Sequence, residues 1–295
     1  MNTSDKPADM SDADIAKLAT VFRDGIFRDQ VVLVSGGGTG IGKVTAALFA
    51  RLGATVAICG RNEKRLEKAA EFLRGLGGKV SAHAMTIRDP DQVAAMMDKV
   101  WSEHGRLDVL VNNAGGQFAQ PAIDIKPKGW NAVIDTNLNG TWYMMQNAAR
   151  HWRDRGQPGN IINVVAVIWR GLPHVAHTCA SRAGVVFLSK TVAVEWAPLN
   201  IRVNCVAPGT IRTEAFNYYP DSGRASFDQA NPMLHAGDSW DVAEAIVYVA
   251  SQAGKFITGE VLNIDGGQQC WGDLWFAGRP PYFELDYSVS RQGAA

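Results

Sequence analysis

The stretch VVLVSGGGTGIGKVTAALFARLG, residues 31–53, decides the fold of this chain. Five residues typical of a buried strand lead into a cluster of glycines, and a helical pattern begins directly after them. Gly36, Gly40 and Gly42 let the backbone turn tightly and approach a pyrophosphate, and the free N–H groups of the following helix point at that charge. We therefore predict a dinucleotide-binding turn made by Ser35, Gly36, Thr39, Gly40, Ile41 and Gly42.

The rest of the chain repeats this alternation of strand and helix. Short runs that are apolar on both faces suit a parallel sheet covered by helices on each side. Seven such runs without a linker predict one α/β domain, a Rossmann-type doubly wound seven-stranded parallel sheet. The expected strands are 31–35, 55–59, 79–84, 107–112, 160–167, 201–208 and 260–264.

Segments outside this alternation predict the remaining organisation. One stretch lacks a clear period and is long for a loop in a compact domain, which is typical of a lid or binding element. The C-terminal stretch is rich in aromatic residues, Phe276 among them, so we expect it to pack on the substrate end or on another subunit. The expected parts are a leader over 1–27 with a short helix near Asp14–Phe22, a Rossmann-fold domain over 28–267 with a lid at about 212–235, and a tail over 268–295.

Composition excludes several classes of protein. The formal net charge is zero, which gives no sign of nucleic acid or of an anionic membrane surface as a partner. No apolar run reaches the roughly 20 residues of a membrane span, and the acidic N-terminus does not fit a signal peptide. The cysteines show neither metal nor disulfide spacing, so we expect no metal site and reduced, mostly buried thiols in a cytoplasmic protein. They are Cys59, Cys179, Cys205 and Cys270.

The end of the second expected strand bears on the choice of cofactor. NAD-binding proteins of this fold keep a carboxylate there to hold the ribose 2′-hydroxyl. This chain reads ICGRNEKR instead, with Arg61 at the strand end. Because a guanidinium suits a 2′-phosphate, the sequence favours NADPH/NADP+.

Four ordered motifs over residues 30–267 resemble the short-chain dehydrogenase/reductase family. They are SGGGTGIG, NNAG at 112–115, DTNLNG at 135–140 and APGTIRT at 207–213. The resemblance implies a nicotinamide cofactor, a homo-oligomer (tetramer or dimer) and Asn137 as the active-site asparagine. It also implies cofactor contacts from Ile87, Asn113, Ala114, Gly115, Arg182, Pro208, Gly209, Ile211 and Thr213.

The catalytic positions depart from the family pattern of Ser and Tyr-x-x-x-Lys. The serine position holds Val165 or Ala166, Thr178 stands for Tyr, and Arg182 stands for Lys. The family's enoyl-thioester reductases, peroxisomal trans-2-enoyl-CoA reductase and 2,4-dienoyl-CoA reductase, are similar in tolerating such changes and in the stretch GGQF at 115–118. The dienoyl reductases keep Lys at the position of Arg182, so Arg182 favours the monoenoyl type.

The chemistry implied by this resemblance fits the substitutions. Reducing a 2-enoyl-CoA thioester sends hydride to Cβ and leaves an enolate, whose oxygen needs hydrogen-bond donors rather than full protonation. Thr178 can be such a donor, and Arg182 can hold the ribose and supply positive field. His177, next to Thr178, is a candidate proton donor near neutral pH. The catalytic residues expected are Asn137, Thr178, Arg182 and His177.

Three alternatives remain open from the sequence. The chain could reduce 2,4-dienoyl-CoA, or could be an atypical carbonyl reductase with His177 or a lid tyrosine (Tyr218, Tyr219) as the acid. It could also be an NADPH-binding pseudoenzyme without turnover. An acyl-CoA or similar thioester is the expected small-molecule partner.

Overall fold

The computed structural model describes residues 10–218, 226–271 and 276, and its centre is one parallel sheet. The strand order is β3-β2-β1-β4-β5-β6-β9, and every neighbouring pair is parallel. The order reverses between β1 and β4, which is where an open α/β sheet leaves a crevice at the carboxyl ends of its strands. The strands are β1 Val31–Ser35, β2 Thr55–Gly60, β3 Val80–Ala84, β4 Val109–Asn112, β5 Gly159–Val164, β6 Ile201–Pro208 and β9 Val261–Ile264.

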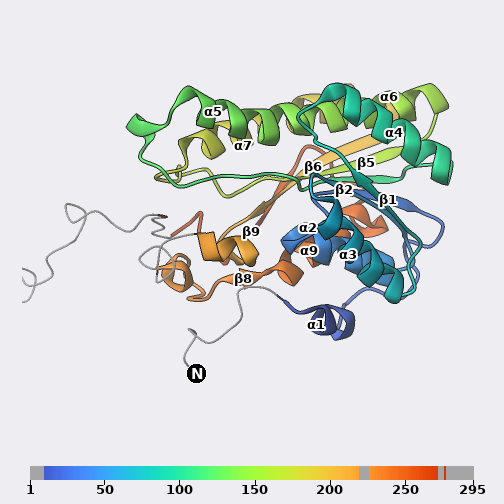
Figure 1. Ribbon diagram of the computed structural model, residues 1–295, viewed down its shortest axis with the longest axis horizontal. Helices are drawn as coiled ribbons and strands as arrows, with labels where there is room; N and C mark the ends of the chain where they lie inside the picture. The colour runs from blue at the N-terminus through green and yellow to red at the C-terminus, as the bar shows by residue number, and fades with distance from the viewer. Residues whose placement is uncertain (1–9, 219–225, 272–275, 277–295) are drawn as a thin grey trace, which may run out of the picture.

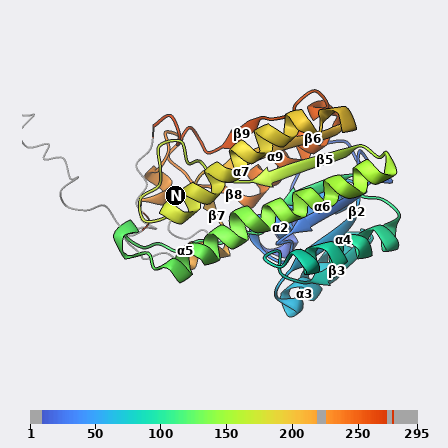
Figure 2. The same cartoon turned by 90° about the horizontal axis from the view of Figure 1, so that it is seen from above.

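Helices cover both faces of this sheet in three layers. In Figures 1 and 2, α4, α6 and α7 lie along one face, and α2, α3 and α9 lie along the other. Figure 1 also shows α1 below α2. The helices are α1 Asp12–Lys17, α2 Gly40–Arg51, α3 Glu63–Gly75, α4 Pro90–His104, α5 Pro127–Ile134, α6 Gly140–Arg155, α7 Ala176–Glu195 and α9 Ser239–Ala250.

Short elements connect these layers. A two-stranded parallel pair, β7 and β8, lies beside the main sheet and was not predicted. The short elements are η2 Ala122–Asp124, the π-helical turn η3 Asp135–Asn139, η4 Ala197–Leu199, β7 Ile211–Arg212, η5 Glu214–Tyr218, η6 Phe227–Gln229, β8 Gly237–Asp238 and η7 Gln252–Gly254.

Two large apolar clusters, one on each face, hold the sheet between the helices. Alternate residues of β1 supply both: Val32 and Val34 pack with α2 and α9, whereas Val31 and Leu33 pack with α4 and α6. All of β1 is buried, which explains why its sequence shows no polar alternation. The prediction of a single α/β domain with a seven-stranded parallel sheet is confirmed.

The N-terminal segment from residue 10 onward packs on α2. Ile15 and Phe27 are buried in the core, and Arg51 donates hydrogen bonds to the carbonyl oxygens of Ile15 and Leu18. The helix begins earlier than expected, at Asp12, because the Ser11 side chain accepts a hydrogen bond from a backbone N–H and caps it. In the part of the chain that the structure describes, no helix is long and apolar enough to cross a membrane.

The cysteines are all free but unequally buried. Cys59 and Cys205 are buried, and burial raises their pKa values to about 12 and about 11. Cys179 is half-buried and Cys270 is exposed, so the expectation of mostly buried thiols is wrong for Cys270. That residue follows β9, beyond the layers that bury Cys59 and Cys205.

Candidate functional site

The glycine turn between β1 and α2 is locked to the end of β4. The Ser35 hydroxyl accepts hydrogen bonds from the backbone N–H groups of Asn113 and Ala114, at 3.1 and 3.0 Å. The Asn113 side chain in turn donates to the carbonyl oxygen of Ser35, at 3.1 Å. A Cβ on Gly42 would lie under 3.0 Å from the Gly36 carbonyl oxygen, a separation that real Cβ atoms essentially never show. The turn therefore requires glycine, and it brings the first turn of α2 to the edge of a cavity.

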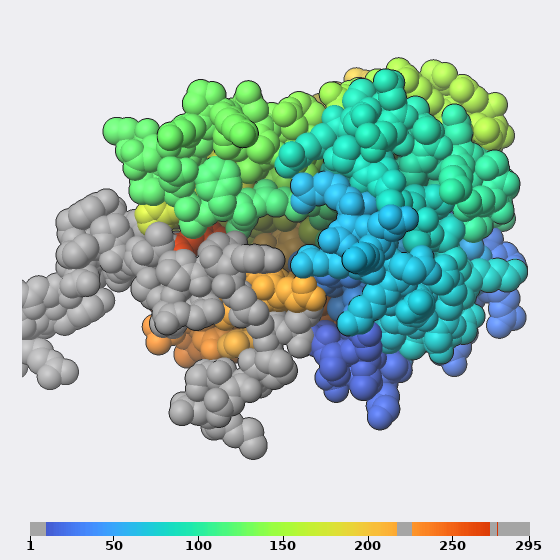
Figure 3. Space-filling view, viewed as in Figure 1, coloured from blue at the N-terminus to red at the C-terminus, as the bar shows by residue number. Residues whose placement is uncertain are grey.

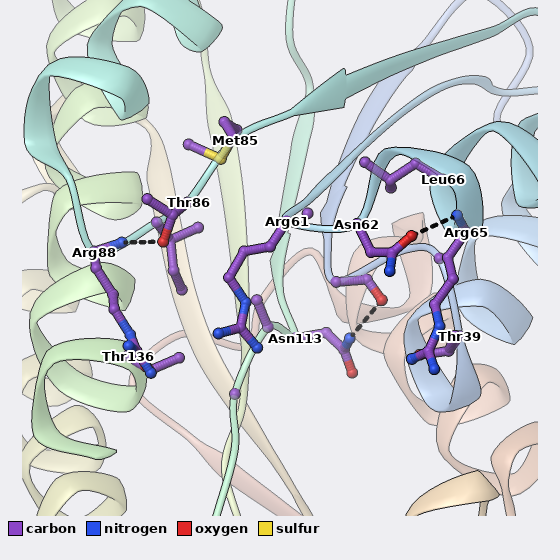
Figure 4. A pocket seen from close by; sticks show the side chains of 16 residues that line it. Thr39, Arg61, Asn62, Arg65, Leu66, Met85, Thr86, Arg88, Asn113 and Thr136 are labelled. Carbon is purple, nitrogen blue, oxygen red and sulfur yellow. Dashed lines mark hydrogen bonds between the residues drawn. The ribbon is translucent and has the colours of Figure 1, made fainter. Parts of the chain in front are cut away.

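A cavity of about 570 Å³ opens beside this turn, at the carboxyl ends of β1 to β4. Arg61, Arg65 and Arg88 line it, and no carboxylate is among the described residues of its wall. Figure 4 shows the three guanidinium groups across the cavity, with Arg65 beside Thr39 and Arg88 beside Thr136. Arg88 is held there by a 2.5 Å hydrogen bond from its Nε to the Thr136 hydroxyl.

Local structure explains where these arginines come from. Arg61 follows β2, and the next residue, Asn62, caps α3 by accepting a hydrogen bond from the Arg65 backbone N–H. This cap places Arg65 in the first turn of α3, on the same side as Arg61. The sequence predicted Arg61 here but missed Arg65 and Arg88. The pattern RNEKR after a strand could have indicated Arg65, whereas Arg88 follows β3 with no comparable signal.

The segment after β4 is held by the buried Asn137. Its Oδ1 accepts a hydrogen bond from the Gly116 N–H at 2.9 Å, and its Nδ2 donates to the Gly116 carbonyl oxygen at 3.0 Å. Asn137 lies in the π-helical turn η3, a local departure from the α-helix of the kind often found at functional sites. It acts on Gly116 and does not itself line either cavity.

A second cavity, of about 920 Å³, continues from the first at Thr39, Asn113 and Gly115. Thr178 and Arg182, from the start of α7, line it, and so do the two candidates for the serine position, Val165 and Ala166. The backbone after β6 lines the same space through Pro208, Gly209, Thr210, Ile211 and Thr213.

Arg182 lies almost buried in the wall. Its Nη1 donates a hydrogen bond to the Val164 carbonyl oxygen at 2.8 Å, and a Cβ on Gly115 would meet its guanidinium. Burial lowers the pKa of Arg182 to about 10, so the group stays cationic at neutral pH. A fixed positive charge therefore faces the junction of the two cavities.

His177 is fully buried and is not among the residues that line the cavity. Its Nδ1 accepts a hydrogen bond from the Thr178 N–H at 2.8 Å and lies 3.3 Å from the Thr178 hydroxyl oxygen. Its ring packs edge-on against Phe118, and its Nε2 has no hydrogen-bond partner among the described residues. Burial lowers the pKa of His177, which favours the neutral ring. The structure thus places this residue behind Thr178 as a support for its backbone.

The predicted cofactor residues lie around the two connected cavities, apart from Ser35 and Gly42, which shape the turn behind them. Ile87 and Ala114 line the first cavity, and Gly40 and Ile41 line the second. Gln268 was missed: its Oε1 accepts hydrogen bonds from the N–H and the hydroxyl of Thr210 and ties the start of the tail to the backbone after β6. Tyr219 lies outside the described residues, as does the side chain of Tyr218.

A glycine turn at a helix N-terminus, at the point where the strand order reverses, defines a dinucleotide-binding α/β protein. Residues 36–269 match the family described as Enoyl-(Acyl carrier protein) reductase. A probable 2,4-dienoyl-CoA reductase of Bacillus subtilis is 37% identical over 244 residues, which are 81% of this chain and 96% of that protein.

Two further similarities agree with this match. The 3-oxoacyl-acyl-carrier-protein reductase FabG of Thermotoga maritima is 37% identical over 239 residues, 81% of this chain and 97% of that protein. The solved structure of the citronellol catabolism dehydrogenase AtuB of Pseudomonas aeruginosa covers 85% of this chain and 100% of its own, at 35% identity and a TM-score of 0.77. The chain belongs to the short-chain dehydrogenase/reductase family of nicotinamide-dependent oxidoreductases, and the resemblance seen in the sequence is confirmed.

Proposed function

We propose that this protein is an NADPH-dependent reductase of the carbon–carbon double bond of a 2-enoyl-CoA thioester. The observation that carries the proposal is the wall of the second cavity, where Thr178 and Arg182 stand next to the backbone after β6. Among the described residues of this wall, Arg182 and Glu214 alone carry charge, and Glu214 is exposed. Tyrosine, lysine and histidine are absent from the same described wall.

This donor set suits an enolate better than an alkoxide. A ketone reduced by hydride must gain a proton on oxygen, which needs a general acid with a pKa near the working pH. A threonine hydroxyl and an arginine can donate hydrogen bonds but cannot give up a proton near neutral pH. An enolate oxygen needs only such donors, because its proton is taken up at carbon.

Thr178, Arg182 and Asn137 have different roles in this reaction. The nicotinamide, when bound, supplies a hydride to the β-carbon of the thioester. Thr178 donates a hydrogen bond to the thioester oxygen, and the buried charge of Arg182 stabilises the negative charge that develops there. Water completes the reduction by giving a proton to the α-carbon. Asn137 holds the Gly116 backbone and so keeps the junction of the two cavities in place.

The arginines of the first cavity support NADPH over NADH. Arg61, Arg65 and Arg88 provide three cations where an NAD-binding protein has a carboxylate. Arg61 and Arg65 both line the cavity, and neither makes an ion pair with a described residue, so both guanidinium groups are available for a 2′-phosphate. A cytoplasmic location and assembly into dimers or tetramers stay predictions of the sequence.

The test is the rate of NADPH oxidation by the purified protein with crotonyl-CoA and longer 2-enoyl-CoA thioesters. Thr178→Val removes the hydroxyl and keeps the shape, so we expect kcat to fall on the order of 100-fold, the usual effect of losing one such donor. Thr178→Ser should keep most of the activity. Equal rates for the Val and Ser variants would contradict the role of the hydroxyl, and no oxidation at any chain length would overturn the proposed reaction.

A second candidate reaction is reduction of 2,4-dienoyl-CoA, supported by the similarity to the Bacillus subtilis protein. The same assay with a 2,4-dienoyl-CoA separates the two candidates by the ratio of kcat/KM values. A 3-oxoacyl thioester in the same assay tests for carbonyl reduction, the reaction that the name of the Thermotoga maritima relative describes. Calorimetric binding of NADPH without turnover of any of these substrates would indicate a pseudoenzyme.

A further inference from the structure

The second cavity contains an aromatic wall formed by residues that are far apart in the sequence. Four phenylalanines line it: Phe118 after β4, Phe216 in η5, Phe227 in η6 and Phe276 in the tail. Phe216 and Phe227 pack edge-to-face with centroids 4.7 Å apart, and Phe227 and Phe276 do the same at 6.1 Å. Phe216, Phe227 and Phe276 belong to a small apolar cluster that also contains Val175 and is separate from the cores on either side of the sheet.

An ion pair holds two of these rings in place. Arg212 donates to both carboxylate oxygens of Asp228 at 2.6 Å, and its guanidinium lies 5.4 Å from the centroid of the Phe216 ring. Asp228 directly follows Phe227 and also accepts a hydrogen bond from the Ala236 N–H. The pair therefore ties the segments of Phe216 and Phe227 together, so that the wall is formed before any ligand binds.

Phe276 reaches this wall from the C-terminal tail. Phe276 is 7% exposed, although Trp271, earlier in the tail, is exposed. Gln268 anchors the start of the tail to Thr210. In Figure 3 the red atoms of the described C-terminal residues lie between the green atoms around α5 and the orange atoms of the segment beyond β6. The tail thus adds a side chain to the substrate space and does not only cover the surface.

We infer that the four phenylalanines form a pocket for a neutral aliphatic acyl chain, and that Phe276 sets the longest chain that the pocket accepts. This inference rests on the proposed function for the reaction, but the pocket itself follows from the rings. An aromatic wall stabilises methylene groups by the area that it removes from water. Among the described wall residues, the charged groups are Arg182, which faces the cofactor junction, and Glu214. No cation is therefore left in that wall for a carboxylate at the far end of the chain.

The experiment compares Phe276→Ala with the wild type and with Phe256→Ala, a matched change at a phenylalanine that is 99% exposed. Calorimetric affinities for saturated acyl-CoA thioesters of increasing length are measured with NADP+ present, alongside kcat/KM for the matching 2-enoyl-CoA series. In the wild type we expect the affinity and kcat/KM each to rise about fourfold per added methylene until the pocket is full. Phe276→Ala should move that limit to longer chains, because further methylene groups can fill the space of the lost phenyl ring. Phe256→Ala should not move the limit.

Phe276→Trp makes the opposite change, and its larger ring should reduce the longest acyl chain that the pocket accepts. Wild-type affinity that is independent of chain length would overturn the inference, and so would identical limits in Phe276→Ala and Phe256→Ala, with circular dichroism showing that both are folded. If binding follows chain length as expected while no enoyl thioester is reduced, the pocket stands and the proposed reaction fails. An acyl chain that ends in a carboxylate should bind more weakly than its methyl-ended counterpart, and equal affinity would also count against the pocket.

Discussion

Gly42→Ala tests whether the turn between β1 and α2 requires glycine. The added methyl group would lie under 3.0 Å from both the Gly36 carbonyl oxygen and the Asn113 side-chain nitrogen. Neither can give way without cost, because one is backbone and the other donates a hydrogen bond to the Ser35 carbonyl oxygen. Overpacking of this kind costs about 1–3 kcal/mol, and the lost hydrogen bond adds about 1 kcal/mol. We therefore expect a loss of about 2–4 kcal/mol in the free energy of unfolding.

Thermal unfolding followed by circular dichroism measures this loss, which corresponds to a fall in Tm of about 3–7 °C for a chain of this size. Gly38→Ala in the same turn is the matched control. A Cβ there would meet its nearest atoms, in Arg65 and Leu66, at 3.6 Å, which is ordinary contact, so its Tm should stay or rise slightly. Equal Tm values for the two variants would refute the close packing inferred for Gly42.

Three further changes test the site. Asn137→Ala removes both hydrogen bonds to Gly116 and should lower the free energy of unfolding in urea by about 2 kcal/mol. The control Asn147→Ala on α6 loses one hydrogen bond to a helix carbonyl and should cost less than about 1 kcal/mol. Similar losses in the two variants would contradict the role of Asn137 in holding Gly116. The double variant Arg61→Ala, Arg65→Ala should weaken NADP+ binding about 10- to 100-fold by calorimetry and leave NAD+ binding unchanged, so a parallel loss for both would contradict 2′-phosphate recognition. Burial lowers the pKa of His177 below its ordinary 6.5. As the pH falls, the unfolded chain therefore binds a proton at this residue before the folded chain does, and the free energy of unfolding decreases below about pH 6.5. His177→Gln should therefore show a shallower fall in Tm between about pH 7 and about pH 5, and an unchanged slope would contradict the neutral buried ring.

The sequence predicted the sheet well, because each buried strand carries its own signal. β1 and β6 begin and end where expected, since nearly all of their residues are buried and a glycine follows each strand. The expected strand at 160–167 instead ends at Val164. Val165 and Val167 look like strand residues in the sequence, but they line the second cavity. A buried strand and an apolar cavity wall have the same composition, so the sequence did not separate them.

The site was predicted only where a motif marks it. Arg65 and Arg88 reach the first cavity through a helix cap and a loop after β3, and both positions depend on packing between distant segments. Phe276 belongs to the tail that was expected to pack on the substrate end or on another subunit, and it lines the second cavity. His177 shows the converse limit. Its place next to Thr178 in the sequence made it a candidate proton donor, but successive residues of a helix face different directions, and its ring lies behind Phe118.

The most direct test of the proposed reaction follows the hydride. The protein is incubated with a 2-enoyl-CoA and NADPH that carries deuterium at the transferable position, and mass spectrometry of the product locates the label. We expect a saturated acyl-CoA with one deuterium at the β-carbon and, in deuterated water, a second at the α-carbon. An unchanged enoyl-CoA, together with a labelled hydroxyl-bearing carbon from a 3-oxoacyl thioester, would contradict the assignment of Thr178 and Arg182 to double-bond reduction.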